Sequence, residues 1–264
     1  MMTVPAFRAR KASGPPLVVL TAYDAMTAAA AEAAGVDALL VGDSLGMVEL
    51  GYASTLPVTM DDMLHHAKAV GRARKDALLV VDMPWLSFHT GAHDAIRNAA
   101  RFVREAGADA VKLEGGRKRV DVIRAVLDAE IPVMGHLGLT PQSVLAMGGY
   151  KVQGRGKDAA DALVDDARAI AEAGVFSIVL EGIPADLAER IGNAVDVPTI
   201  GIGAGVACDG QVLVIHDLLG MLPGDVPKFV RRYADLHGAA RDAIRRWADD
   251  VRARTFPSRD ETYG

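Results

Sequence analysis

Cysteine, aromatic residues and long apolar runs are all scarce in this chain of 264 residues. The single cysteine, Cys208, excludes an intrachain disulfide and fits a reducing compartment. Aromatic residues make up only 5% while glycine numbers 27, which suits helices packed closely on a sheet better than a β-sandwich. No run of 18 apolar residues occurs, and residues 1–16 lack the apolar segment of a signal peptide. We therefore expect a cytoplasmic α/β protein.

An excess of positive charge is absent as well. Lysine and arginine number 29 against 34 aspartates and glutamates, so the net charge is −5 and the isoelectric point is about 5.8. This balance argues against a general nucleic-acid binder, because contact with a phosphate backbone needs a basic surface. A local basic patch remains possible, and no membrane span is expected.

The chain does contain a regular alternation of short apolar runs with alanine-rich helical patterns. Strands are predicted at 17–22, 38–42, 77–83, 110–114, 132–136, 176–181, 198–203 and 211–216. Helices are predicted at 24–34, 60–74, 92–106, 119–129, 159–173, 185–195 and 228–253. Strands that alternate with helices form parallel sheets, and eight of them favour one (β/α)8 TIM barrel domain over residues 1–264. An open doubly wound sheet is the alternative, and residues 1–15 and 254–264 carry no motif.

Ionisable residues end almost every predicted strand, at the edge where (β/α)8 barrels build their active sites. They are Asp24, Asp43, Asp82, Lys112, Glu114, His136, Glu181 and His216. A single acid in such a place is usually the N-cap of the next helix, which is our prediction for Asp24. Helix capping alone does not explain an ionisable residue at almost every strand end. The remaining residues therefore predict a catalytic site at one mouth of the barrel.

Carboxylates predominate at this predicted mouth. Asp43, Asp82, Glu114 and Glu181 are set against Lys112 alone, and carboxylates gathered in one place repel each other unless a cation joins them. Oxygen ligands without a cysteine cluster suit a hard divalent ion, and Mg²⁺ typically takes one or two carboxylates with water and substrate oxygens. Two direct aspartates and a more distant glutamate would match. A metal-free salt-bridge network around Lys112 is the alternative.

Two glycine-rich stretches do not match nucleotide-binding motifs. GIGAGV at 201–206 has Val206 where a dinucleotide fingerprint needs glycine, and GGYKVQGRGK at 148–157 does not fit a P-loop. The second stretch follows the fifth predicted strand and carries three basic residues. It predicts either a mobile lid over the site or a plain surface loop.

Eight segments stand in order over most of residues 17–230. They are TAYD (21–24), VGDSLGM (41–47), STLPVT (54–59), VKLEGG (111–116), GHLGLTPQSV (135–144), GGYKVQGRG (148–156), IGIGAG (200–205) and DGQVLVIHDLLG (209–220). Together they resemble the ketopantoate hydroxymethyltransferase family. The resemblance implies a barrel of the phosphoenolpyruvate/pyruvate-binding type, a Mg²⁺ ion and a homo-oligomer, a decamer arranged as a pentamer of dimers. It also implies transfer of a one-carbon unit from 5,10-methylenetetrahydrofolate to 3-methyl-2-oxobutanoate, giving 2-dehydropantoate for pantothenate.

The resemblance assigns a role to individual residues of this chain. The family's metal aspartates, which also belong to its substrate site, match Asp43 and Asp82, and its outer metal-associated glutamate matches Glu114. Its substrate contacts match Ser44 and Lys112, and its proton acceptor matches Glu181. His136 falls at a position that resembles an active-site histidine lining the substrate pocket.

Two other interpretations remain open at this point. One is a different Mg²⁺-dependent enzyme on the same barrel, a carbon–carbon lyase or phosphonomutase that acts on an oxo acid. Such enzymes usually supply a nucleophilic cysteine or an extra acidic loop, and neither stands out in this sequence. The other is a barrel that binds a metabolite or a partner without catalysis, which the set of acids and a lysine at the mouth makes improbable.

Overall fold

Eight parallel strands close into a barrel in which every strand pairs with its neighbours in sequence order and β1 pairs with β8. The strands are β1 (Leu17–Thr21), β2 (Ala38–Val41), β3 (Leu78–Asp82), β4 (Ala110–Glu114), β5 (Val133–Gly138), β6 (Ser177–Glu181), β7 (Thr199–Ile202) and β8 (Gly210–Leu213). This computed structural model describes residues 1–263 and divides into two units, residues 1–214 and the part from 215 onward. The closed sheet confirms the predicted (β/α)8 barrel. The prediction of one domain over residues 1–264 stays a prediction.

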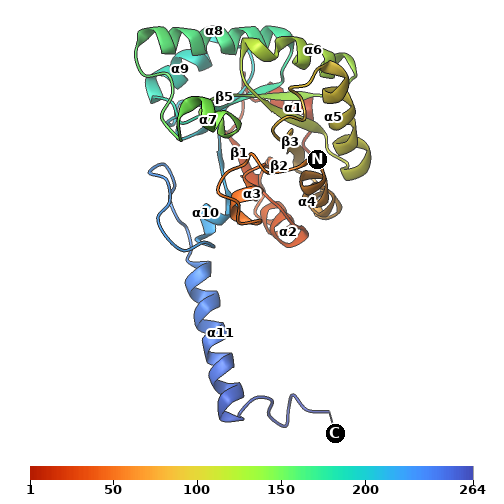
Figure 1. Cartoon of the computed structure of the whole chain (residues 1–264), viewed down its shortest axis with the longest axis vertical. Helices are drawn as coiled ribbons and strands as arrows, with labels where there is room; N and C mark the ends of the chain where they lie inside the picture. Colours follow the sequence, from red (N-terminus) through yellow and green to blue (C-terminus); the bar gives the residue numbers. More distant parts are fainter. Residues whose placement is uncertain (264) are drawn as a thin grey trace. The chain divides into compact units, whose positions relative to one another are not determined.

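Helices cover the outside of the strands in the first unit (Figure 1). The long ones are α2 (Ala25–Ala33), α4 (Met60–Ala73), α5 (Ala92–Ala106), α6 (Val120–Asp128), α8 (Lys157–Ala173) and α9 (Ala185–Ala194). Short α3 (Leu45–Val48), η1 (Arg117–Arg119), η2 (Pro141–Ser143) and α7 (Val144–Met147) lie in loops that follow strands. The predicted bounds of the long helices agree with these within two residues. Asp24 caps α2 by accepting a hydrogen bond from Thr27 N at 2.6 Å, as predicted.

Three predicted bounds were wrong. β5 runs two residues further than expected, to Gly138, so His136 lies inside the strand. The eighth strand stops at Leu213, where its pairing with β1 ends, and His216 belongs instead to α10 (Ile215–Leu219) in the second unit. The last helix, α11 (Leu236–Ala253), begins eight residues later than predicted because the Asp235 side chain caps it by accepting from Gly238 N at 2.9 Å.

The N-terminal segment, which carries no motif, packs into the barrel core. Phe7 lies in α1 (Val4–Ala9) and is completely buried, and its ring meets Phe176 edge-on at 5.7 Å between centroids. Phe176 immediately precedes β6, so this contact lies at the N-terminal ends of the strands. Phe7 also joins the cluster of inward-facing strand residues that includes Leu40, Val80 and Val179. α1 therefore closes the end of the barrel opposite the predicted site.

Replacing Phe7 with alanine is expected to lower the free energy of unfolding by about 3–5 kcal/mol, because it empties a fully buried aromatic position. For a chain of this size the corresponding drop in melting temperature is roughly 10 °C. Thermal unfolding followed by circular dichroism measures it. Phe229→Ala, at a residue that is 39% exposed, is the matched control. An equal, small shift in both variants would contradict a core role for α1.

Candidate active site

All seven residues assigned from the resemblance line one cavity of about 90 Å³ at the C-terminal ends of the strands. They are Asp43, Ser44, Asp82, Lys112, Glu114, His136 and Glu181. Asp82, Lys112, Glu114 and His136 are nearly inaccessible, at 2–6% exposed. Of the other ionisable residues at predicted strand ends, Asp24 is a helix cap and His216 lies outside this unit. The assignments of metal, substrate and proton-acceptor roles stay predictions.

Strand register explains why these side chains meet. Side chains alternate across a strand, so Lys112 and Glu114 point to the same face of β4. Asp82 is the register partner of Lys112 across β3 and β4, and Glu114 is that of His136 across β4 and β5. Glu181 ends β6 opposite Gly138, two positions beyond His136. The parallel pairing thus delivers each ionisable group to the same mouth.

Lys112 supplies a permanent positive charge. Its Nζ lies 2.9 Å from Asp82 Oδ1, and both side chains are almost completely buried. Burial by itself lowers the pKa of an ammonium, but the carboxylates of Asp82, Glu114 and Asp43 outweigh it and raise the pKa of Lys112 above its usual value. Lys112 therefore stays protonated at physiological pH and can face a developing negative charge.

His136 connects Lys112 with two carboxylates. Its Nδ1 lies 3.1 Å from Lys112 Nζ and 3.4 Å from Glu114 Oε1, while its Nε2 lies 3.1 Å from Glu181 Oε2. Burial and the charge of Lys112 disfavour the imidazolium, but hydrogen bonds to Glu114 and Glu181 outweigh them and raise the pKa of His136 to about 9. These opposed contacts let the ring hold or release a proton beside Glu181.

Asp43 and Asp82 contribute two carboxylates to the wall of the same cavity. Asp43 N donates to Asp82 Oδ2 at 3.1 Å, and both residues are 4% exposed. Burial first, and then the charges of Asp82 and Glu114, raise the pKa of Asp43 well above its usual range. A divalent cation would relieve this repulsion. Within residues 1–263 no group of three or more histidine, cysteine or acidic side chains is arranged to hold a metal. Two oxygen-donor aspartates are nevertheless a set that suits Mg²⁺.

Glu114 is held apart from that pair by neighbours of its own. Its Oε2 accepts a hydrogen bond from Gln142 N at 3.1 Å, and its Oε1 faces His136. The Gln142 side chain then reaches Asp43, where Nε2 donates to Oδ2 at 2.9 Å. Reasoning from the sequence did not single out Gln142. The one available signal was its place inside the segment GHLGLTPQSV.

Tyr23 is a second contact that the sequence did not single out. Its hydroxyl lies 2.8 Å from Ser44 Oγ, and the residue is completely buried. Burial raises the pKa of Tyr23 beyond its usual value, so it remains a neutral phenol that orients Ser44. The same corner has no room for a side chain at Gly42, because a Cβ there would lie 2.8 Å from Ser44 Oγ.

The glycine-rich loop 148–157 contacts segments that border the cavity. Tyr150 OH lies 3.7 Å from Met47 Sδ in α3, which follows β2, and Gln153 N donates to Gly182 O, directly after Glu181. Burial, and then the charges of Asp43 and Glu181, raise the pKa of Tyr150. These contacts place the loop beside the mouth. Its action as a lid stays a prediction.

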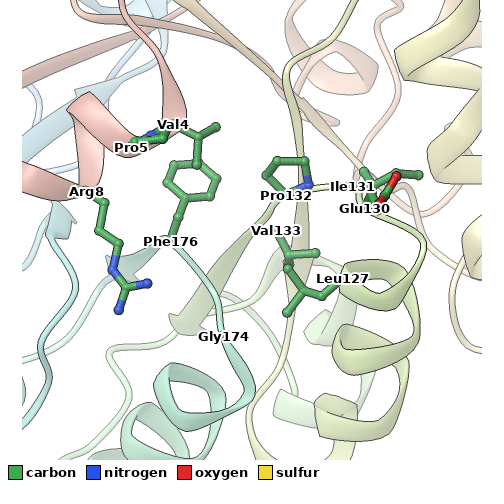
Figure 2. Close-up of a pocket in the computed structure, with 10 residues that line it drawn as sticks. All are labelled: Val4, Pro5, Arg8, Leu127, Glu130, Ile131, Pro132, Val133, Gly174 and Phe176. Carbon is green, nitrogen blue, oxygen red and sulfur yellow. The ribbon is translucent and has the colours of Figure 1, made fainter.

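A larger cavity of about 420 Å³ lies at the other end of the barrel (Figure 2). It is lined by Val4, Pro5, Arg8, Leu127, Glu130, Ile131, Pro132, Val133, Gly174 and Phe176. Arg8 and Glu130 lie on opposite sides of it in this view, and Arg8 is already paired with Asp196 at 3.0 Å. None of the predicted site residues lines this cavity. The larger volume therefore does not make this cavity the candidate site, and the cavity where charged groups converge is the better candidate.

Comparison with known proteins agrees with the resemblance. A family model described as ketopantoate hydroxymethyltransferase matches residues 1–259. The chain is 54% identical over 262 residues to 3-methyl-2-oxobutanoate hydroxymethyltransferase of Syntrophomonas wolfei, covering 99% of this chain and 95% of that one. It is 55% identical over 262 residues to the protein of the same name from Trichlorobacter lovleyi, covering 99% of this chain and 98% of that one.

Solved structures of similar fold are more distant in sequence. A putative phosphonomutase from Burkholderia cenocepacia aligns with a TM-score of 0.65 at 20% identity, over 81% of this chain and 93% of that one. The 2,3-dimethylmalate lyase, a member of the PEP mutase/isocitrate lyase superfamily, aligns with a TM-score of 0.63 at 19% identity, over 99% of this chain and 89% of that one. These two likenesses concern the fold and are consistent with a barrel of the phosphoenolpyruvate/pyruvate-binding type.

Proposed function

Because the chain belongs to the ketopantoate hydroxymethyltransferase family, we propose that the cavity of about 90 Å³ at its barrel mouth is the active site. The reaction transfers a one-carbon unit from 5,10-methylenetetrahydrofolate to 3-methyl-2-oxobutanoate and gives 2-dehydropantoate, a step of pantothenate biosynthesis. One observation carries the proposal: the seven assigned residues come from five strands or the segments after them and line this one cavity. Its small volume suits the branched oxo acid, with the folate approaching from outside.

Asp43 and Asp82 would hold the Mg²⁺ ion, with Glu114 outside the pair. Their positions on the wall of one cavity, and the raised pKa of Asp43 that burial and neighbouring acids cause, support a cation at this place. When bound, Mg²⁺ supplies Lewis-acid stabilisation of negative charge on the ketone and carboxylate oxygens of the substrate. The two aspartates would orient the oxo acid indirectly, because the position of the bound cation sets where the negatively charged substrate oxygens are most stable.

Lys112 and Ser44 would bind the substrate directly. The ammonium of Lys112 is buried and stays charged, so it stabilises the negative charge that develops on a substrate oxygen as C3 loses its proton. The pairing with Asp82 holds Nζ in place before the reaction, which limits the reorganisation needed. Ser44, oriented by Tyr23, offers a hydroxyl on the neighbouring wall.

Glu181 would be the base that removes the C3 proton. Its side chain is 17% exposed, more than the side chains of Asp82, Lys112 and His136, and it ends β6 at the rim of the cavity. His136 Nε2 lies 3.1 Å from one carboxylate oxygen of Glu181, and the raised pKa of His136 keeps a proton on the ring that can be donated to this oxygen and hold the base in place. The carbanionic C3 then bonds to the methylene carbon of the folate, which approaches past loop 148–157. Both bonds from that carbon to folate nitrogens break, water supplies the hydroxyl group of 2-dehydropantoate, and tetrahydrofolate leaves with the two protons that C3 and the water give up.

The alternative function, that of a lyase or phosphonomutase, is supported only by the similarity of fold. The structures with those names share 20% identity or less with this chain, whereas the hydroxymethyltransferases share 51–55% over nearly its full length. A likeness of fold does not transfer an activity, because different chemistries use the same barrel. The family membership therefore favours one-carbon transfer.

Nuclear magnetic resonance of the C3 proton of 3-methyl-2-oxobutanoate in D₂O tests the proposal. The full chain with Mg²⁺ is expected to exchange this proton for deuterium, and removal of Mg²⁺ with a chelator is expected to stop the exchange. Adding 5,10-methylenetetrahydrofolate should convert the oxo acid to 2-dehydropantoate. Binding of the oxo acid with no exchange of C3 under any of these conditions would contradict an enolising enzyme.

Assembly and location follow the family resemblance. The proposed enzyme is a cytoplasmic homo-oligomer, a decamer formed as a pentamer of dimers. Large apolar side chains on α11 support burial against another chain, since Ile244 is 62% and Trp247 is 55% exposed. No helix within residues 1–263 is long and apolar enough to span a membrane. Analytical ultracentrifugation of the full chain measures the mass of the assembly.

A further inference from the structure

A glutamine in the loop after β5 connects the ends of three neighbouring strands. Gln142 is 6% exposed and lies in η2. Its Nε2 donates to Asp43 Oδ2 and to the carbonyl oxygen of Met83, both at 2.9 Å. Its backbone N donates to Glu114 Oε2 at 3.1 Å. One residue thus reaches the segments that follow β2 and β3 and the last residue of β4.

The contacts leave the amide of Gln142 only one orientation. Turned over, its carbonyl oxygen would face the Asp43 carboxylate and the Met83 carbonyl, and none of these three groups can donate a hydrogen bond. In the observed orientation Oε1 is buried and has no hydrogen-bond partner within residues 1–263. A buried acceptor without a partner is unfavourable. The presence of a glutamine at this buried position is therefore best explained by the hydrogen bond that its Nε2 donates to Asp43.

We propose that Gln142 is a positioning residue for the divalent cation, an inference that rests on the metal site described under the proposed function. By donating to Oδ2 it fixes the rotation of the Asp43 carboxylate, and through its backbone N it keeps Glu114 beside His136. Outer partners that orient a ligating carboxylate raise the affinity of a site for its metal. The same glutamine also donates to the carbonyl oxygen of Met83, which directly follows Asp82 at the end of β3.

A neutral amide suits this position better than a charged group. A lysine or arginine would place a competing cation next to the metal aspartates. A glutamate would add a fourth carboxylate beside Asp43, Asp82 and Glu114, and like charges gathered in one place repel each other. An amide donates hydrogen bonds without changing the net charge of the mouth.

Gln142→Met in the full chain tests the inference, because methionine has a similar volume and no donor, while the backbone bond to Glu114 is retained. Isothermal titration with MgCl₂ in the absence of substrate is expected to show a dissociation constant about 10–100-fold higher than for the unaltered chain. Gln211→Met is the matched control, since Gln211 is exposed on β8 and its side-chain amide donates to Gly205 O, away from the carboxylates of the mouth. Its dissociation constant is expected to stay within about twofold.

A second readout separates positioning from a merely structural role. The rate of C3 proton exchange in Gln142→Met should be restored largely by high Mg²⁺, so the concentration for half-maximal rate shifts while the maximal rate changes little. Thermal unfolding in the presence of a chelator reports whether Gln142→Met folds. If Gln142→Met does not fold, Gln142→Asn replaces it, because the shorter amide cannot reach both Asp43 and Met83.

Three results would overturn the inference. An unchanged Mg²⁺ dissociation constant in Gln142→Met would remove the positioning role while leaving the proposed function intact. Exchange that saturating Mg²⁺ does not restore would assign the residue to the substrate or to folding instead. An unaltered chain that binds no Mg²⁺ at all would remove the metal site and with it both proposals.

Discussion

Glu181→Gln is expected to lower the rate of C3 proton exchange by about 10²–10⁴-fold, the usual contribution of a positioned general base. The amide keeps the size of the side chain and a group that can meet His136 Nε2, but it cannot accept the C3 proton. Binding of the oxo acid should change little, because Lys112, Ser44 and the Asp43–Asp82 pair are untouched. Exchange by nuclear magnetic resonance and binding by calorimetry measure the two effects separately.

Glu189→Gln is the matched control for this prediction. Glu189 is exposed on α9, the helix that follows β6, so the same chemical change there should leave exchange and binding unaltered. A loss of binding as large as the loss of exchange in Glu181→Gln would make Glu181 a substrate contact rather than the base. An exchange rate like that of the unaltered chain would require another base at the rim.

Asp82→Asn should weaken Mg²⁺ and oxo-acid binding together. It removes one carboxylate of the Asp43–Asp82 pair. It also removes the negative charge next to Lys112, because Asp82 Oδ1 lies 2.9 Å from Lys112 Nζ. We expect the Mg²⁺ dissociation constant to rise at least about 100-fold, beyond the range for residues that only orient ligands. Calorimetric titration with MgCl₂, and with oxo acid at fixed MgCl₂, measures both.

Asp186→Asn, at an exposed position in the first turn of α9, controls for the loss of one acid from the chain. It should leave both dissociation constants unchanged. An Asp82→Asn variant with the Mg²⁺ requirement of the unaltered chain would contradict the assignment of Asp82 as a ligand. It would instead favour the metal-free ion-pair network around Lys112 that the sequence left open.

The two strongest expected effects thus concern residues that the sequence itself singled out. Asp82 and Glu181 each follow an apolar run, and parallel strands bring the carboxyl ends of such runs to one edge. The pair of charges in β4 was informative for the same reason. Lys112 and Glu114 stand two residues apart, so the alternation of a strand sends both to one side.

Residues without such a local signal were missed. Phe7 belongs to a segment with no motif, and its burial comes from Phe176, far along the chain. Gln142 is a polar residue in a loop, and its bond to Asp43 spans 99 positions of sequence. Tyr23 stood only within the segment TAYD, and its contact with Ser44 exists because β1 and β2 are adjacent.

The opposite error occurred at His216. An apolar run followed by histidine predicted a strand end, but the pairing of β8 with β1 stops at Leu213 and the next residues turn into α10. Hydrophobic patterning reports which side chains are buried and does not report where a ladder of backbone hydrogen bonds ends. Five of the seven residues around the cavity lie at paired strand positions, and Asp43 and Ser44 follow the end of β2.

The sequence by itself determined the class of fold, the ionisable groups at the strand ends and, through long motifs, the family. The first two depend on periodicity and on spacing along the chain, and the family depends on the resemblance of contiguous segments, so all three are local properties. Only the tertiary structure decided that α1 closes the far end of the barrel and that Asp82 pairs with Lys112 while His136 lies between Glu114 and Glu181. It alone showed Gln142 bonded to Asp43 and Glu114. Such contacts arise when a closed barrel brings distant segments within hydrogen-bond reach, and no pattern within one segment encodes that distance.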